Sequence, residues 1–118
     1  MAIINKTKDE FQIECQNYVN RIAEELENIH AGNALTEDGE PLTMWDYFAD
    51  VLDYEFIITS RKEYYGVKAW VTLGGPSIWI DTTDGSVQLA WGTHTAWRKL
   101  TTDTRDEIDA VFEDYYNC

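Results

Sequence analysis

The spacing of the hydrophobic residues changes twice along this 118-residue chain, and this change most constrains its fold. Up to about residue 53, apolar residues recur at intervals of three and four, as on one face of a helix. From Tyr54 to about residue 92 the interval is two, with many β-branched and aromatic residues, as in strands. After Thr104 the helical interval returns. The pattern predicts a single α+β domain over residues 1–118.

The first helix is expected to begin after Thr7, which has capping-box spacing to Glu10, and to end near Gly32. Its buried face consists of apolar and aromatic residues three and four apart: Phe11, Cys15, Tyr18, Val19, Ile22, Leu26 and Ile29. The segment 32–41, rich in Gly, Asn, Thr and acidic residues, is expected to be a loop.

A second, shorter helix is expected to follow, capped by Thr43 and running to about Asp53. Its apolar side consists of Met44, Phe48, Val51 and Leu52. Asp46, Asp50 and Asp53 fall at i, i+4 and i+7, which predicts one exposed acidic stripe. Like charges so placed cost roughly 0.2–0.5 kcal/mol per pair, so the stripe is mildly unfavourable for the helix itself.

Four antiparallel strands are predicted over residues 54–60, 66–73, 77–82 and 86–92, connected as a meander. Asp84-Gly85 is a strong hairpin signal, and a two-residue loop there predicts the pairs Thr83 with Ser86, Ile80 with Leu89 and Ile78 with Trp91. An even loop from Gly74 to Ser77 predicts the pairs Leu73 with Ile78 and Val71 with Ile80.

This register predicts one apolar face for the sheet, which the helices cover. That face consists of Val67, Ala69, Val71, Leu73, Ile78, Ile80, Val87, Leu89 and Trp91. Trp70 and Trp79 point to the opposite face. Either a loop or the region around Arg98 covers them, or they form an exposed aromatic patch for a partner.

The last helix is expected to begin near Thr104, because Glu107 repeats the capping spacing. Its buried stripe consists of Ile108, Val111, Phe112 and Tyr115. The complete prediction is an α+β fold with two N-terminal helices, a four-stranded antiparallel β-meander and a C-terminal helix packed on one face of the sheet.

The acidic residues are concentrated in the first half of the chain. Between Arg21 and Arg61 lie 39 residues without a Lys or Arg, and this stretch carries ten carboxylates. The net charge is −13, of which about ten negative charges belong to residues 1–60. Direct binding of DNA or RNA is not expected, because that affinity comes from Lys and Arg neutralising phosphates. A cationic partner or high solubility accounts for such a charge.

The sequence gives little sign of catalysis. His30 and His94 have no second His or Cys at metal-ligand spacing, so we expect no metal and no cofactor. Cys15 is expected to be buried and Cys118 exposed, without a disulfide. No apolar run is long enough to span a membrane, and the first residues lack a signal peptide, so we expect a cytoplasmic protein without enzymatic activity. The sequence sets no oligomeric state.

Four segments carry a resemblance to known proteins: MWDYFADVLDYEF, GGPSIWIDT, VQLAWG and the ending IDAVFEDYYNC, within residues 44–118. They resemble an uncharacterised family of small acidic accessory proteins from bacterial conjugative elements and phages. Anti-restriction and anti-CRISPR proteins occur in the same genetic neighbourhoods. The resemblance therefore implies an anti-defence role in a bacterial host cell.

The charge pattern gives a physical reason for such a role. Defence nucleases hold DNA or RNA in grooves lined with Lys and Arg, and carboxylates spaced along a folded surface can compete for such a groove by charge mimicry. The leading hypothesis is an inhibitor of a bacterial defence nuclease, with a CRISPR effector as the first partner and a restriction enzyme as the next. The residues expected to bind the partner are Glu24, Glu25, Glu27, Glu37, Asp38, Glu40, Asp46, Asp50 and Asp53.

Two other functions fit the sequence. One is a protein-interaction module of a mobile element that docks through Trp70 and Trp79, with Tyr64 and Tyr65 nearby, while the acids provide solubility. The other is an acidic regulator of conjugation or replication enzymes, which would also bind a basic groove. The sequence does not separate this regulator from an anti-defence protein.

Overall fold

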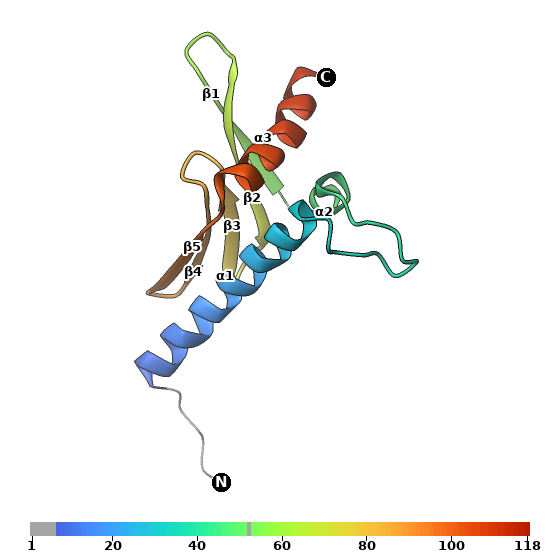
Figure 1. The fold of residues 1–118 in the computed structure, drawn as a ribbon. Helices are drawn as coiled ribbons and strands as arrows, with labels where there is room; N and C mark the ends of the chain where they lie inside the picture. Colours follow the sequence, from blue (N-terminus) through green and yellow to red (C-terminus); the bar gives the residue numbers. More distant parts are fainter. Residues whose placement is uncertain (1–6, 52) are drawn as a thin grey trace.

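The computed structural model describes residues 7–51 and 53–118, and Figure 1 shows the arrangement of its elements. Two helices precede a five-stranded antiparallel sheet, and one helix follows it. The elements, in chain order, are α1 (Lys8–His30), α2 (Met44–Ala49), β1 (Asp53–Ile58), β2 (Tyr64–Thr72), β3 (Ser77–Asp81), β4 (Ser86–Trp91), β5 (His94–Lys99) and α3 (Thr102–Asn117). The α+β class is confirmed.

The first helix follows the prediction closely. The Thr7 side chain accepts a hydrogen bond from the Glu10 amide at 3.1 Å, which satisfies one of the free N–H groups of the first turn. The helix ends at His30 with Ala31 as its C-cap, and Gly32 follows with a φ of +77°, a conformation that glycine adopts without strain.

The second helix is shorter than predicted. Helix α2 ends at Ala49, and Asp53 is already in strand β1, paired with Trp70. No basic residue lies in the last turn of α2, and Asp50 at its C-terminus is unfavourable for the helix dipole. These residues therefore leave the helix, and the predicted stripe of Asp46, Asp50 and Asp53 on one helix does not exist. The Leu52 prediction lies outside the described residues.

The five strands lie in the order β1-β2-β3-β4-β5. Both predicted registers are wrong: Ile80 pairs with Val87 and with Ala69, each two residues from the predicted partner. The turn between β3 and β4 is two residues longer than expected, whereas between β2 and β3 the shift is one residue at the turn and a second at a bulge. A two-residue shift keeps the side chains of the regularly paired residues on their predicted faces. A β-bulge between Trp70 and Thr72 also interrupts the pairing, and Leu73 lies exposed beyond the end of β2 rather than on the apolar face.

Strand β5 was not predicted. It follows β4 through a tight turn at Gly92-Thr93, with Gly92 at a φ of +61°. Its inward residues are His94, Ala96 and Arg98, of which only Ala96 is apolar, so the strand lacks hydrophobic alternation. The other two face α1: the His94 ring lies 4.6 Å from the Phe11 ring, and Arg98 pairs with Glu24.

Helices α1 and α3 cover the same face of the sheet, and the core lies between the two layers (Figure 1). It contains Val19 and Leu26 of α1, Val67, Ile80 and Leu89 of the sheet, and Phe112 of α3, each no more than 1% exposed. Cys15 is buried and Cys118 exposed, both as free thiols, which confirms the prediction for the two cysteines.

The last helix begins two residues earlier than expected. Thr101 caps it by accepting from the Thr104 amide at 3.3 Å, and Thr104 is fully buried inside the first turn. Glu107 makes no capping box; it contacts His30 of α1 at 2.7 Å instead. The cap lies earlier because a carboxylate of α1, Glu27, adds a second acceptor at this helix end.

Candidate functional site

Six of the nine predicted partner-binding carboxylates lie together at the end of the molecule where α1 leads into α2. All six are exposed, and within residues 7–51 and 53–118 none forms an ion pair with a Lys, Arg or His. We call this group the acidic end; it consists of Glu25, Glu37, Asp38, Glu40, Asp46 and Asp50. The segment that carries half of it, between α1 and α2, projects away from the sheet in Figure 1.

The projecting segment has defined backbone hydrogen bonds. Leu35 and Pro41 form an isolated antiparallel bridge, the Thr36 amide donates to the Glu40 carbonyl at 2.7 Å, and the Leu42 amide donates to the Ala34 carbonyl at 2.9 Å. Residues 34–42 therefore form a small hairpin with Glu37, Asp38 and Glu40 around its tip. This geometry keeps three carboxylates close together on an exposed turn.

The other three predicted site residues do not belong to the acidic end. Glu24 lies 3.6 Å from Arg98 of β5, which partly neutralises it. Asp53 lies on the sheet face opposite the helices, next to Trp70. Glu27 accepts from the Thr101 amide at 2.7 Å and from the hydroxyls of Thr101 and Thr104, so it holds α1 to α3 and is not free for a partner.

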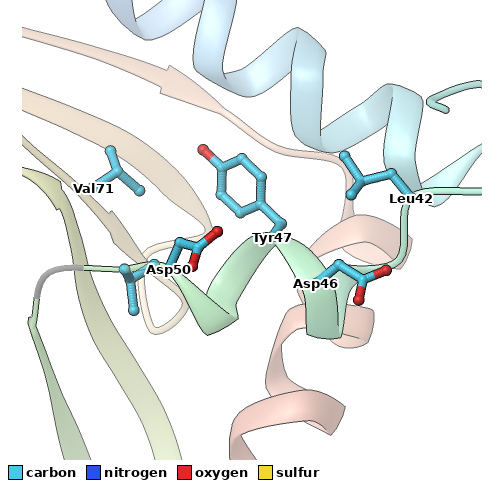
Figure 2. Close-up of a pocket in the computed structure, with 6 residues that line it drawn as sticks. Leu42, Asp46, Tyr47, Asp50 and Val71 are labelled. Atoms are coloured by element: carbon cyan, nitrogen blue, oxygen red, sulfur yellow. The ribbon is translucent and has the colours of Figure 1, made fainter. Parts of the chain in front are cut away.

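A pocket lies within the acidic end, between α2 and the neighbouring strand. We call it the Tyr47 pocket; its volume is about 310 Å³, and it is lined by Leu42, Asp46, Tyr47, Asp50, Val51 and Val71. Figure 2 shows Tyr47 in the middle, with Asp50 and Val71 on one side and Leu42 and Asp46 on the other. The pocket is apolar at its walls and carries two carboxylates.

Two side chains of the pocket have perturbed acidity. Burial, and then the negative charge of Glu25, raises the pKa of Tyr47 well above its ordinary value, so the phenol stays protonated. The side-chain and backbone hydrogen bonds from Thr43 lower the pKa of Asp46, so Asp46 stays a carboxylate. The bond from the Thr43 amide to Asp46 Oδ2, together with the bond from the Asp46 amide to the Thr43 hydroxyl, forms the capping box at the start of α2. The Thr43 hydroxyl also donates to Asp46 Oδ2.

The sheet face opposite the helices carries a row of tryptophans. Adjacent strands pair Trp70 with Trp79, Trp79 with Gln88, and Gln88 with Trp97, so these side chains cross the sheet side by side. We call this surface the open face. Trp97 is 60% exposed, whereas Trp70 and Trp79 are half-buried.

Lys68 partly covers the two inner tryptophans. Its ammonium lies 5.4 Å from the ring centre of Trp70 and 5.2 Å from that of Trp79, within the range of cation–π attraction. The region around Arg98 does not cover them, because Arg98 points to the helix side of the sheet toward Glu24. The predicted cover by Arg98 was therefore wrong, while the half-burial of Trp70 and Trp79 lies between the covered and the exposed alternatives. Trp97 was missed because strand β5 was missed.

The described part of the chain, residues 7–51 and 53–118, contains no group of three or more His, Cys, Asp or Glu side chains placed to hold a metal ion. Nor is any helix in that part long and apolar enough to cross a membrane.

Sequence reasoning located the acidic end but missed the pocket within it. The periodicity singled out Met44 and Phe48 as core residues of α2, and both are buried. It gave no role to Tyr47, whose neighbours Leu42 and Val71 come from a loop and from β2. Only the packing of these segments brings the three side chains together, so no local spacing could reveal the pocket.

Comparisons with protein-family models, with curated proteins and with solved structures found no match to this chain. The resemblance to acidic accessory proteins of mobile elements therefore stays a prediction.

Proposed function

We propose that this protein is an inhibitor of a bacterial defence nuclease, acting in the bacterial cytoplasm by placing its acidic end in a basic nucleic-acid groove. The observation that carries the proposal is the group of six exposed carboxylates without a cationic partner in the described residues. A guide-loaded CRISPR effector is the first target to test, because the segment resemblance points to anti-defence proteins.

The placement of the basic residues supports this proposal. Residues 22–60, which carry the whole acidic end, contain no Lys or Arg. Arg61 and Lys62 lie at the turn between β1 and β2, and Lys68, Arg98 and Lys99 lie in strands. The field of the acidic end is thus of one sign, which steers a basic partner toward it and excludes nucleic acid.

The test is DNA cleavage and DNA binding by a panel of guide-loaded CRISPR nucleases and restriction enzymes, with and without the protein, at 0.05–0.5 M salt. We expect at least one nuclease to lose both DNA cleavage and DNA binding, with relief at high salt. The Debye length is about 10 Å at 0.1 M salt and shorter at 0.5 M, so attraction between exposed charges is screened over shorter distances as salt is added.

A matched pair of variants separates the acidic end from net charge. In the first, Glu25, Glu37, Asp38 and Glu40 become the corresponding amides; in the second, Glu55, Glu63, Glu113 and Asp114 do so. All eight residues are exposed, and both variants lose four negative charges. Inhibition should fall only in the first variant. Equal loss of inhibition in both variants would show that only the overall charge matters. If the parent protein inhibits no nuclease, the proposal is refuted.

The row of tryptophans supports a second candidate, a protein-interaction module that docks through the open face. Large aromatic side chains dominate the energy of many interfaces, and Trp97 is the most exposed of the three. Binding by this face would persist at about 0.5 M salt, where the Debye length is well below 10 Å, and would fail on Trp79→Ala or Trp97→Ala. Binding by the acidic end would show the opposite pattern.

A further inference from the structure

The Tyr47 pocket has walls that suit an aliphatic or aromatic contact. Leu42, Val51 and Val71 contribute apolar side chains from three different segments, and the Tyr47 ring stands between them. A volume of about 310 Å³ is at the lower end of the range for small-molecule sites, about 300–1,000 Å³. The space therefore suits a single long side chain.

The polar groups of the pocket are all hydrogen-bond acceptors or can act as such. Asp50 makes no ion pair and no side-chain hydrogen bond within residues 7–51 and 53–118, and Asp46 uses only Oδ2 to bind Thr43, which leaves Oδ1 available. The Tyr47 hydroxyl likewise has no hydrogen-bond partner in this part of the chain. Hydrogen-bond acceptors that have no donor in the fold favour a ligand with several N–H groups.

The charge of the pocket favours a cation. Asp46 and Asp50 line it, Glu25 lies close enough to act on Tyr47, and no lining residue is basic. An arginine combines a cationic head carrying five N–H donors with an aliphatic stem and a planar group that stacks on aromatic rings. Lysine lacks the planar group and binds carboxylates as a point charge.

We propose that the Tyr47 pocket receives an arginine side chain of the basic partner, with the guanidinium at Asp50 and the Tyr47 hydroxyl and the stem against Val51 and Val71. This inference deepens the proposed function and rests on it for the identity of the partner as a basic protein. It makes the pocket the specific anchor within a diffuse acidic surface, as buried arginines are at many interfaces.

The experiment is an NMR titration of the full chain with N-acetyl-arginine amide, observing the methyl groups of Leu42 and Val71 and the ring of Tyr47. Nα-acetyl-citrulline amide has nearly the same shape without the charge, and Nα-acetyl-lysine amide has a free, charged side-chain ammonium without the planar group. We expect arginine to shift these signals saturably, lysine to bind more weakly and citrulline not to bind.

Variants test the assigned contacts. Asp50→Asn should weaken arginine binding about tenfold, as expected for losing a charged hydrogen-bond acceptor. Tyr47→Phe keeps the ring and removes only the hydroxyl, so it should weaken binding by a smaller factor. Asp103→Asn, an exposed acid at the start of α3, is the matched control and should have no effect. Citrulline or lysine binding as tightly as arginine, or an unchanged affinity in Asp50→Asn, would overturn the inference.

The inference and the proposed function can fail separately. If arginine does not bind the pocket, yet the variant lacking four acids loses nuclease inhibition, the inference is wrong and the proposed function stands. If arginine binds the pocket as described and no nuclease is inhibited, the pocket stands and the proposed function is wrong.

Discussion

Glu27 is an acidic residue whose role is structural. Its carboxylate accepts three hydrogen bonds, from the Thr101 amide, the Thr101 hydroxyl and the Thr104 hydroxyl. A side chain of α1 thereby caps the N-terminus of α3. Burial by itself would raise the pKa of Glu27, but these hydrogen bonds outweigh burial and leave the pKa below its ordinary value. The folded state therefore stabilises the ionised form.

Replacing Glu27 with Gln should lower the free energy of unfolding by about 1–2 kcal/mol at pH 7, because hydrogen bonds to a charged acceptor are lost at a helix N-terminus. The contribution of the ionised carboxylate is complete above the ordinary glutamate pKa of about 4.3 and disappears as the pH falls through the lower pKa of the folded state. Urea unfolding at pH 7 and at pH 3 measures both effects.

Glu25→Gln, two residues away and exposed, is the control for this prediction. It should leave the free energy of unfolding within about 0.5 kcal/mol of the parent protein, as most surface substitutions do. A Glu27→Gln variant as stable as this control at pH 7 would contradict the capping role.

At the scale of elements, the turn between β3 and β4 packs onto β2. The Val67 amide of β2 donates to the Thr82 hydroxyl at 2.9 Å, and a Cβ built on Gly66 would lie 2.5 Å from Thr83 Cγ2. Gly66 is thus required by the close approach of the turn rather than by its own backbone conformation. These bonds also explain the register, because Thr82 bonds to Val67 of β2, and Thr83 bonds to the Asp81 carboxylate, instead of extending the hairpin.

Gly66→Ala should destabilise the protein by about 1–3 kcal/mol, the usual cost of forcing an extra carbon into a packed site. Thr83→Ser removes the methyl group that the new Cβ would meet, so the double variant should recover part of this loss. The measurement is urea unfolding of the parent, both single variants and the double variant. A Gly66→Ala variant as stable as the parent, or additive effects in the double variant, would show that the turn does not press on β2.

The elements predicted correctly were those with a clear hydrophobic period. Helix α1 and strands β2 to β4 carry enough buried apolar residues to identify them. The parity of the strands placed the inward residues on their face except Leu73, which lies beyond the bulge and the end of β2. Strand β5 was not predicted because two of its inward residues are polar. His94 and Arg98 contact Phe11 and Glu24 of α1, and local spacing cannot reveal such contacts. The length of α2 was overestimated because pairing of Asp53 with β2 overrides helical periodicity.

The same limit applies to the candidate site. The 39 residues without Lys or Arg marked the acidic end, since charge composition needs no knowledge of packing. The sequence could not show that Glu27 is used inside the fold or that Asp53 faces the tryptophans, because both facts depend on contacts with β-strand or helix residues far along the chain.

At the scale of the whole molecule, the net charge of −13 should make stability depend on salt. Self-repulsion raises the free energy of the compact state, and added ions screen it. Raising NaCl from 50 to 500 mM should increase the free energy of urea unfolding, on the order of 1 kcal/mol. The variant with amides at Glu25, Glu37, Asp38 and Glu40 should show a smaller increase. A parent protein whose stability does not change with salt would contradict this expectation.

The packing of α1 against β5 has a consequence for biosynthesis. Gln12 binds the Thr95 carbonyl, Gln16 binds the Trp97 carbonyl, and Glu27 caps α3, so the first helix finds its partners 74 to 83 residues further along the chain. While the ribosome is still translating the sheet, the apolar side of this helix lacks the strands and the helix α3 that it packs against in the folded protein. Contacts of such long sequence separation form late, so the core should be complete only after α3, which contributes Phe112, has left the exit tunnel. Until then, the many negative charges of the nascent chain are its main protection against aggregation.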